Sequence, residues 1–141
     1  RRKCMAYLIG LLRWQGDEAY DFLVNRCLKG TDDIKPAAVA IFALGRLASE
    51  EYRDLLIAIA AGEFERVLPN LPTDNLEDLA YLQRTAITAL SGVGDLSTVV
   101  TLRESCKSRA PDDSGLDRRL EEALYRTSEE IFWRLNWDRY L

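Results

Sequence analysis

Apolar residues recur every three or four positions along most of this chain, a spacing that places them on one face of an α-helix. The pattern is clearest in AIFALGRLASEEYRDLL, which begins at position 40, and in AITALSGVGDLSTVVTL, which begins 46 residues later at position 86. The two stretches share the apolar core A-I-x-A-L. The chain therefore contains an internal repeat, and each copy is predicted to be helical.

Each copy is interrupted near its middle by residues that typically end one helix and begin another. The first break is AS at 48–49, and the second is GVGD at 92–95. Ser49 or Asp95 can accept hydrogen bonds from the free N–H groups at the start of the following helix. Each copy is therefore predicted to form a hairpin of two helices.

Weaker copies of the pattern flank these two. In the last copy, Thr127 with Glu130 three residues later forms a capping box, which predicts that a second helix starts there. We expect a single domain over residues 1–141, made of four hairpins at about 2–30, 34–61, 75–108 and 114–141. Because the helical pattern begins almost at residue 1, this domain is consistent with a piece of a longer polypeptide.

The stretch 62–74 separates the second hairpin from the third and is too long for a tight turn. It carries two prolines and several apolar residues, among them Phe64 and Leu68, although loops are usually polar. Two interpretations stay open: this insertion folds over the gap between hairpins, or it is a recognition element. Asp74 and Glu77 are expected to cap the helix that follows it.

Composition supports an all-α protein. Of the 141 residues, 48% are hydrophobic and only 8 are glycine and 4 are proline, which disfavours both disorder and a strand-and-turn architecture. The net charge of −4 opposes attraction to phosphate backbones, so nucleic acid is disfavoured as a partner. The three cysteines are scattered within helical apolar patterns, which predicts buried thiols in a reducing compartment. With no apolar run of membrane-spanning length, the predicted location is the cytoplasm.

The period of the repeat falls in the range of HEAT and armadillo repeats, which have two or three helices each. The A-I-x-A-L core, followed by G-x-L or by S-G-V-G-D, resembles the HEAT-like repeats of the bacterial phycobilisome-lyase type over residues 36–107. The resemblance implies an α-α superhelix, a right-handed solenoid of about four HEAT-like hairpins whose second helices line a concave surface. It implies an architecture and not a chemistry.

The sequence offers little for catalysis. It contains no histidine, which removes the commonest general base and the commonest metal ligand. Phosphate-binding and nucleophile-elbow motifs do not occur in it. Paired acids such as Asp32-Asp33 and Glu50-Glu51 lie at or before helix starts, where the helix dipole favours negative charge. We therefore expect no catalytic, cofactor-binding or metal-binding residue, and no cofactor.

Candidate partner contacts come from four places: the aromatic C-terminal stretch, the insertion, the polar side of the second helices, and a basic group around the third-to-fourth hairpin connection. Tryptophan and tyrosine often anchor interfaces, and basic groups contact acidic partners. The candidates are Trp133, Trp137, Tyr140, Phe64, Leu68, Arg53, Asp54, Arg103, Arg118 and Arg119.

The expected function is that of a noncatalytic scaffold that binds another protein or a second copy of this chain, away from membranes. An alternative, suggested by the resemblance, is a lyase-like or chaperone-like cofactor handler that attaches a tetrapyrrole. That function would need a pocket and a reactive, exposed thiol. A third hypothesis is a phosphate-binding or nucleic-acid-binding module that uses the basic group.

Overall fold

A computed structural model describes residues 2–14, 16–47, 49–72, 74–107 and 116–136 of the chain. These residues form helices, turns and loops, and none of them belongs to a strand. The predicted all-helical class is therefore confirmed for the described part of the chain. The order of elements is α1 (Arg2–Leu12), α2 (Asp17–Tyr20), η1 (Asp21–Lys29), α3 (Ile34–Leu47), η2 (Glu50–Tyr52), α4 (Arg53–Ala60), α5 (Phe64–Val67), α6 (Leu76–Ala89), η3 (Leu90–Gly92), α7 (Leu96–Lys107) and α8 (Leu116–Asn136).

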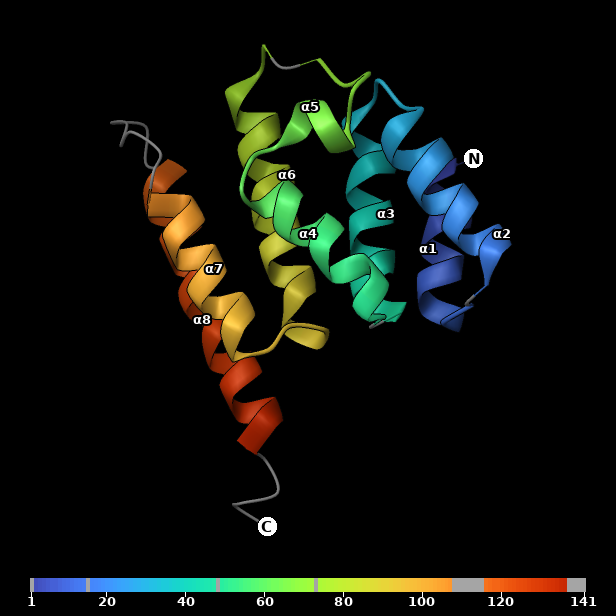
Figure 1. Ribbon diagram of the computed structural model, residues 1–141. Helices are drawn as coiled ribbons and strands as arrows, with labels where there is room; N and C mark the ends of the chain where they lie inside the picture. The colour runs from blue at the N-terminus through green and yellow to red at the C-terminus, as the bar shows by residue number, and fades with distance from the viewer. Residues whose placement is uncertain (1, 15, 48, 73, 108–115, 137–141) are drawn as a thin grey trace.

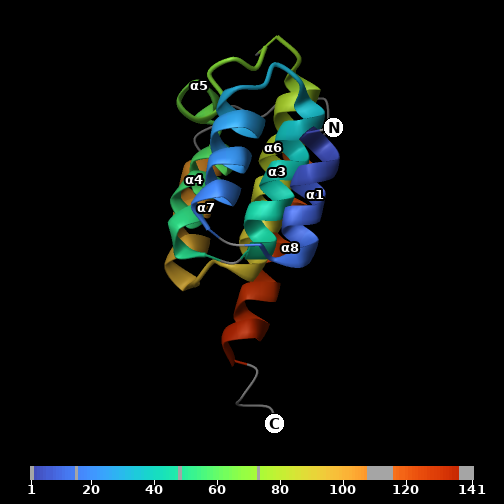
Figure 2. The ribbon, with the colours of Figure 1, turned by 90° about the vertical axis from the view of Figure 1, so that its right-hand side faces the viewer.

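The helices form two layers. Helices α1, α3, α6 and α8 lie in a row in which each contacts the next (Figure 1); we call this row the α6 layer. On its other side lie α4, α7 and the π-helical segment η1, which continues α2; we call these the α4 layer. Figure 2 shows the two layers from the side. Sequential helices therefore alternate between layers through the first three pairs, as the predicted hairpins require.

Glycine and alanine of the repeated motif allow the helices of the α6 layer to approach closely. A Cβ atom on Gly10 of α1 would lie 2.9 Å from the Cα atom of Ala43 in α3. A Cβ atom on Gly45 of α3 would lie 2.7 Å from the Cβ atom of Ala89 in α6. Such distances are too short for real side chains, so only glycine fits these positions at this helix spacing.

The core lies between the two layers. Leu44 of α3 and Ile87 of α6 face it from one side, and Leu56 and Ile59 of α4 face it from the other, all fully buried. Burial of each such side chain contributes about 2 kcal/mol relative to exposure. The apolar positions shared by the two copies of the repeat therefore hold the layers together.

The insertion folds over one end of the stack, in accordance with the first of its two interpretations. Phe64 and Leu68 are buried in the core together with Val67 and Leu71. The Asn70 side chain donates a hydrogen bond of 2.7 Å to the carbonyl oxygen of Lys29, at the end of η1. Phe64 and Leu68 therefore pack in the core, and their role as partner contacts stays a prediction.

Short polar side chains begin the second helices as predicted. Ser49 Oγ accepts a hydrogen bond from the Glu51 backbone N–H at 3.4 Å, and Asp95 Oδ1 accepts one from the Thr98 backbone N–H at 3.0 Å. The start of α6 differs from the prediction, because Asn75 rather than Asp74 caps it. Hairpin ends are thus fixed by local hydrogen bonds.

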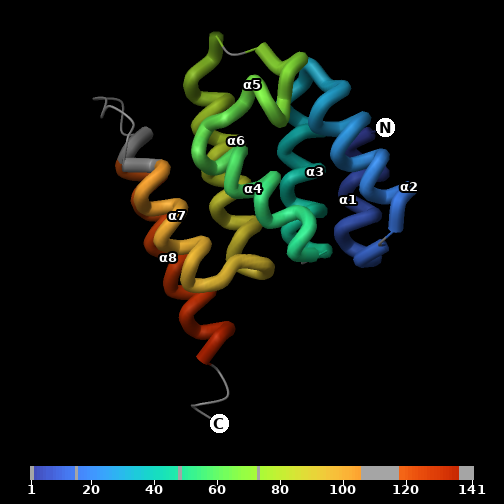
Figure 3. Tube along the Cα trace, viewed as in Figure 1, coloured from blue at the N-terminus to red at the C-terminus, as the bar shows by residue number. Residues whose placement is uncertain are grey.

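The fourth hairpin predicted at 114–141 is wrong for the described residues, since 116–136 form one continuous helix, α8 (Figure 3). Thr127 does not begin a new helix but is buried within α8. The neighbouring Ser128 hydroxyl donates to the Leu124 carbonyl oxygen at 2.6 Å, one turn back. This bond occupies the Ser128 hydroxyl within the helix and caps no new one, and 116–136 contains no glycine or proline to end the helix.

Candidate functional site

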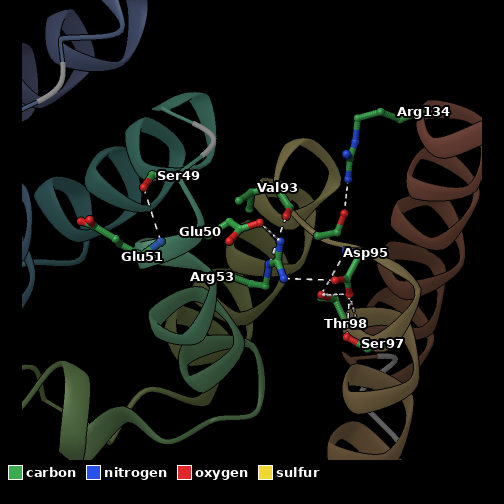
Figure 4. Close-up of polar contacts among 10 residues, drawn as sticks. Ser49, Glu50, Glu51, Arg53, Val93, Asp95, Ser97, Thr98 and Arg134 are labelled. Carbon is green, nitrogen blue, oxygen red and sulfur yellow. Dashed lines mark hydrogen bonds and ion pairs between the residues drawn. The ribbon is translucent and has the colours of Figure 1, made fainter.

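On the α4 layer, Arg53 joins two hairpins. Its guanidinium donates to the Val93 carbonyl oxygen at 3.2 Å and to the Asp95 carboxylate at 3.1 Å (Figure 4). A second, longer ion pair joins the Arg53 guanidinium to the Glu50 carboxylate at 3.6 Å. Arg53, predicted as a partner contact, is therefore occupied by the protein itself.

The Asp95 carboxylate is the acceptor around which this junction is organised. Hydrogen bonds from the Ser97 hydroxyl, the Thr98 backbone and the Thr98 hydroxyl, together with the charge of Arg53, lower the pKa of Asp95 to about 2. Arg134 of α8 adds hydrogen bonds to the Ser91 carbonyl oxygen, at 3.0 Å, and to the Gly94 carbonyl oxygen. The loop between α6 and α7 is thus held from both neighbours.

Much of the remaining polar surface of the α4 layer is also satisfied within the chain. Asn25 donates to the Asp21 carboxylate at 2.9 Å, and the Thr101 hydroxyl donates to the Ser97 carbonyl oxygen at 2.9 Å. Asp54 and Arg103 are exposed. Of these four side chains on the α4 layer, Asn25 and Thr101 are thus hydrogen-bonded within the chain, while Asp54 and Arg103 face solvent.

The predicted aromatic and basic contacts on the last helix are placed in part. Trp133 is 48% exposed and packs edge-on against Phe132, while Ile131 beside them is fully buried. Trp137 and Tyr140 lie outside the described residues. Arg118 and Arg119 are exposed on α8. The described part of α8 thus packs by one face and presents aromatic and basic side chains on another.

A cavity of about 730 Å³ opens on the outer side of the α6 layer, between α3 and α6. Its floor is made of small residues, Gly45, Ala89 and Gly92, which belong to the two copies of the repeated motif. Larger side chains stand around this floor: Arg13, Phe42, Arg46, Tyr81, Arg84, Thr85, Thr88 and Ser91. The small residues that bring α3 and α6 together thus also leave the space that forms the cavity.

Arg84 is the unusual member of this lining. Its Nη1 atom is buried, and no described residue gives it a hydrogen-bond partner. A buried guanidinium N–H without a partner costs about 1–3 kcal/mol or more. Native proteins retain such groups rarely, so each one calls for a specific explanation such as strain, an ordered water, an ion or a functional role.

A second cavity of about 510 Å³ lies between α6 and α8 and continues the first, because Arg84 and Thr88 line both. Its other walls come from α8 and carry charges of both signs: Arg119, Glu122, Ala123, Arg126, Thr127 and Glu130. Together the two cavities form a groove across α3, α6 and α8, which we call the α6 groove. Of the predicted contacts that the structure describes, only Arg119 lines it.

The sequence did not predict the α6 groove, because the candidate polar contacts were assigned to the second helix of each hairpin. Phe42 and Arg46 of α3 are one turn apart, as are Tyr81 and Arg84 of α6. Aromatic and basic residues at i and i+3 or i+4, opposite the apolar stripe, indicate a helix face that is neither core nor ordinary polar surface. That spacing can be read from the sequence. It does not show that α3 and α6 lie side by side.

The described thiols differ in environment. Cys27 is buried, and desolvation raises the pKa of its thiol to about 11 against the opposing charges of Arg2 and Arg26. Cys4 is exposed on α1, which corrects its prediction as a buried thiol, since it lies on the outer side of an end helix. The side chain of Cys106 lies outside the described residues.

Comparison of the chain with protein-family models, curated proteins and solved structures finds no match. Among the described residues, no group of histidine, cysteine and acidic side chains is arranged to hold a metal ion. None of the helices in the described ranges combines the length and apolar character needed to cross a membrane. The site must therefore be interpreted from its own geometry.

Proposed function

We propose that this chain is a noncatalytic protein-interaction module of HEAT-like repeats, acting in the cytoplasm, and that it binds its partner in the α6 groove. The observation that carries the proposal is the buried, unpartnered Nη1 of Arg84 inside a groove that crosses three helices. Three helix pairs followed by α8 are compatible with a right-handed solenoid, an architecture that exposes long surfaces for macromolecular recognition.

The groove is suited to recognition because its walls are rigid. Gly45 fixes the α3–α6 spacing by direct contact with Ala89, and Arg134 anchors α8 to the Ser91 carbonyl at the end of the cavity. A preformed groove loses little conformational entropy when a partner binds. Trp133, exposed at the C-terminal end of α8, is a second candidate anchor.

The test is affinity capture from nuclease-treated lysate with groove and control variants. Thr88→Trp fills the groove at an exposed position of α6, and Thr101→Trp places the same bulk on α7 in the other layer. We expect Thr88→Trp to lose the captured proteins that both the wild type and Thr101→Trp retain. Circular dichroism confirms that all baits fold.

A Trp133→Ser bait separates the two candidate surfaces. Loss with Trp133→Ser but not with Thr88→Trp would move the interface to the end of α8 and overturn the groove assignment. Equal capture by every variant would overturn the interaction proposal at both surfaces.

A cofactor handler is the second candidate, favoured by the volume of the first cavity, which lies within the usual range for small-molecule sites. Its chemistry would need a reactive thiol near the cavity. Cys4 is exposed but lines neither cavity, and Cys27 is buried with a raised pKa. Rapid modification of a native thiol that is blocked by Thr88→Trp would support this function over the first.

A further inference from the structure

We propose that the occupant of the α6 groove is an acidic peptide segment of a partner protein, with an apolar side chain seated between its carboxylates. This inference rests on the proposed function and specifies the chemistry of the partner. The groove would bind carboxylates through Arg13, Arg46 and Arg84 and the apolar side chain against Phe42 and Tyr81.

Local charge is the first argument. The described residues that line the first cavity include three arginines and no acidic side chain. The chain as a whole carries a net charge of −4, so this concentration of positive charge runs against the composition of the protein. Clefts lined by one sign of charge focus the field and attract the opposite sign. The charge of this cavity therefore favours an acidic ligand.

The state of Arg84 is the second argument. Arginine presents a planar set of N–H donors that matches a carboxylate in a bidentate geometry. With Nη1 buried and unpartnered among the described residues, Arg84 lacks an acceptor that a carboxylate entering the groove would supply.

Arg13 adds a second positive group whose backbone is held in an uncommon conformation. It is the described non-glycine residue with a positive φ, 49°, at the end of α1. A left-handed residue directly after the last helical turn is a common way to end a helix, so this φ is explained by the C-cap of α1 and does not by itself indicate a ligand. The conformation closes α1, with the Trp14 N–H bonded to the Ile9 carbonyl at 3.0 Å, and it places Arg13 among the lining residues.

Aromatic walls supply the apolar half of the site. Phe42 and Tyr81 are 39% and 47% exposed, high values for large side chains on a helix surface. Phe42 is held in place by Tyr7 of α1, with ring centroids 6.0 Å apart in a stacked arrangement. Because the floor between them is glycine and alanine, an apolar side chain can enter and be covered by both rings.

The length of the groove favours a peptide over a small anion. The second cavity continues the first past Arg84 and Thr88. There Glu122 and Glu130 lie beside Arg119 and Arg126, so the second cavity does not favour a ligand of one charge as the first cavity does. A nucleic acid presents one phosphate after another and would place some of them against Glu122 and Glu130, whereas a peptide can carry its acidic residues at one end only.

The experiment uses arrays of synthetic peptides in which acidic and apolar residues are varied independently, probed with the wild-type protein. We expect binding to peptides that combine Glu or Asp with Leu or Phe. Replacement of every Glu by Gln, or of the apolar residue by Ser, should weaken binding about tenfold or more. Binding should also weaken as salt is raised. Equal binding of the Glu and Gln peptides would overturn the proposal.

Variants then assign the charge to particular side chains. Arg84→Gln should weaken binding of the best acidic peptide about tenfold, and Arg84→Lys should restore only part of it, because lysine lacks the bidentate donors. Arg46→Glu is compared with Arg103→Glu, which makes the same change of charge on α7. Equal losses from these two would show a nonspecific effect of net charge and contradict the site.

The peptide experiment can fail without the proposed function failing. If Thr88→Trp abolishes partner capture from lysate while no acidic peptide binds, the groove is an interface for a different chemistry and only the peptide proposal falls. If Thr88→Trp affects neither capture nor peptide binding, both proposals fall. Oligonucleotide binding that is lost in Arg84→Gln would replace the acidic peptide by a phosphate ligand.

Discussion

Two partly buried arginines, one in each layer, show how differently the two faces of this protein are completed. Arg53 on α4 finds a carbonyl oxygen and carboxylates within its own chain. Arg84 on α6 has a buried Nη1 for which the described residues provide no acceptor. Both positions carry the same side chain, so the difference lies in what the neighbouring hairpin places opposite it.

The two faces of this repetitive fold use their polar groups for different purposes. The α4 face uses its polar groups to connect successive helix pairs, as at Asp95 and Val93. On the α6 face, charged and aromatic side chains surround a cavity. Within it, the Nη1 atom of Arg84 has no hydrogen-bond partner among the described residues. A satisfied network stabilises the fold, whereas an incomplete one is unfavourable until an acceptor is supplied, and a ligand is the acceptor that we propose at Arg84.

The largest expected effect comes from the spacing that both faces share. Gly45→Val should destabilise the fold by roughly 3 kcal/mol, because its side chain would collide with Ala89 and force α3 away from α6. Gly92→Ala is the matched control, since its Cβ atom would lie 3.4 Å from the Gly45 carbonyl oxygen, an ordinary contact. Urea unfolding measures both; equal stabilities would show that the close α3–α6 approach is not required.

Removal of the satisfied arginine should be the next largest effect. Arg53→Met deletes the bonds to Val93 and Asp95 and is expected to cost about 1.5 kcal/mol, since hydrogen bonds to charged groups contribute more than neutral ones. Arg66→Met, at an exposed ion pair with Glu63, should change stability by less than about 0.5 kcal/mol. Thermal or urea unfolding that fails to separate the two would remove the structural role given to Arg53.

Removal of the unsatisfied arginine should have the opposite sign. Arg84→Met keeps an apolar stem but deletes the buried N–H, so we expect the unbound protein to gain about 1 kcal/mol while it loses the acidic peptide. Gain of stability with loss of binding is the expected signature of a functional residue. A clear destabilisation by Arg84→Met would mean that Arg84 supports the fold, as Arg53 does.

The smallest effect is the pH dependence that Asp95 gives to the α4 face. The pKa of Asp95 is about 2 in the folded protein and about 3.9 in the unfolded chain. Ionised Asp95 therefore stabilises the folded state fully at pH values above the unfolded pKa. This contribution is lost as the pH falls from about 5 towards 2. Asp95→Asn should flatten the stability profile in that window. A profile unchanged by the substitution would show that Asp95 is not preferentially ionised in the folded state.

Much of the architecture followed from local sequence patterns. The A-I-x-A-L repeat predicted helices in pairs, and Ser49 and Asp95 predicted where second helices begin. Prediction failed at Thr127, where a capping-box pattern lies inside one continuous helix. A cap pattern states that a helix start is possible there. Whether the helix stops depends on helix-breaking residues, which 116–136 lacks, and on tertiary packing, which buries Thr127 and Ile131 within α8.

The sequence by itself determined the helical class, the pairing of helices and the small residues at their contacts, because spacing and side-chain size act within a few turns of chain. Only the tertiary structure decided which faces remain open. It buried Phe64 and Leu68, occupied Arg53, and brought Phe42, Arg46 and Arg84 around one cavity. These outcomes depend on residues about 40 positions apart meeting across α3 and α6, and no local pattern specifies which polar groups find acceptors there.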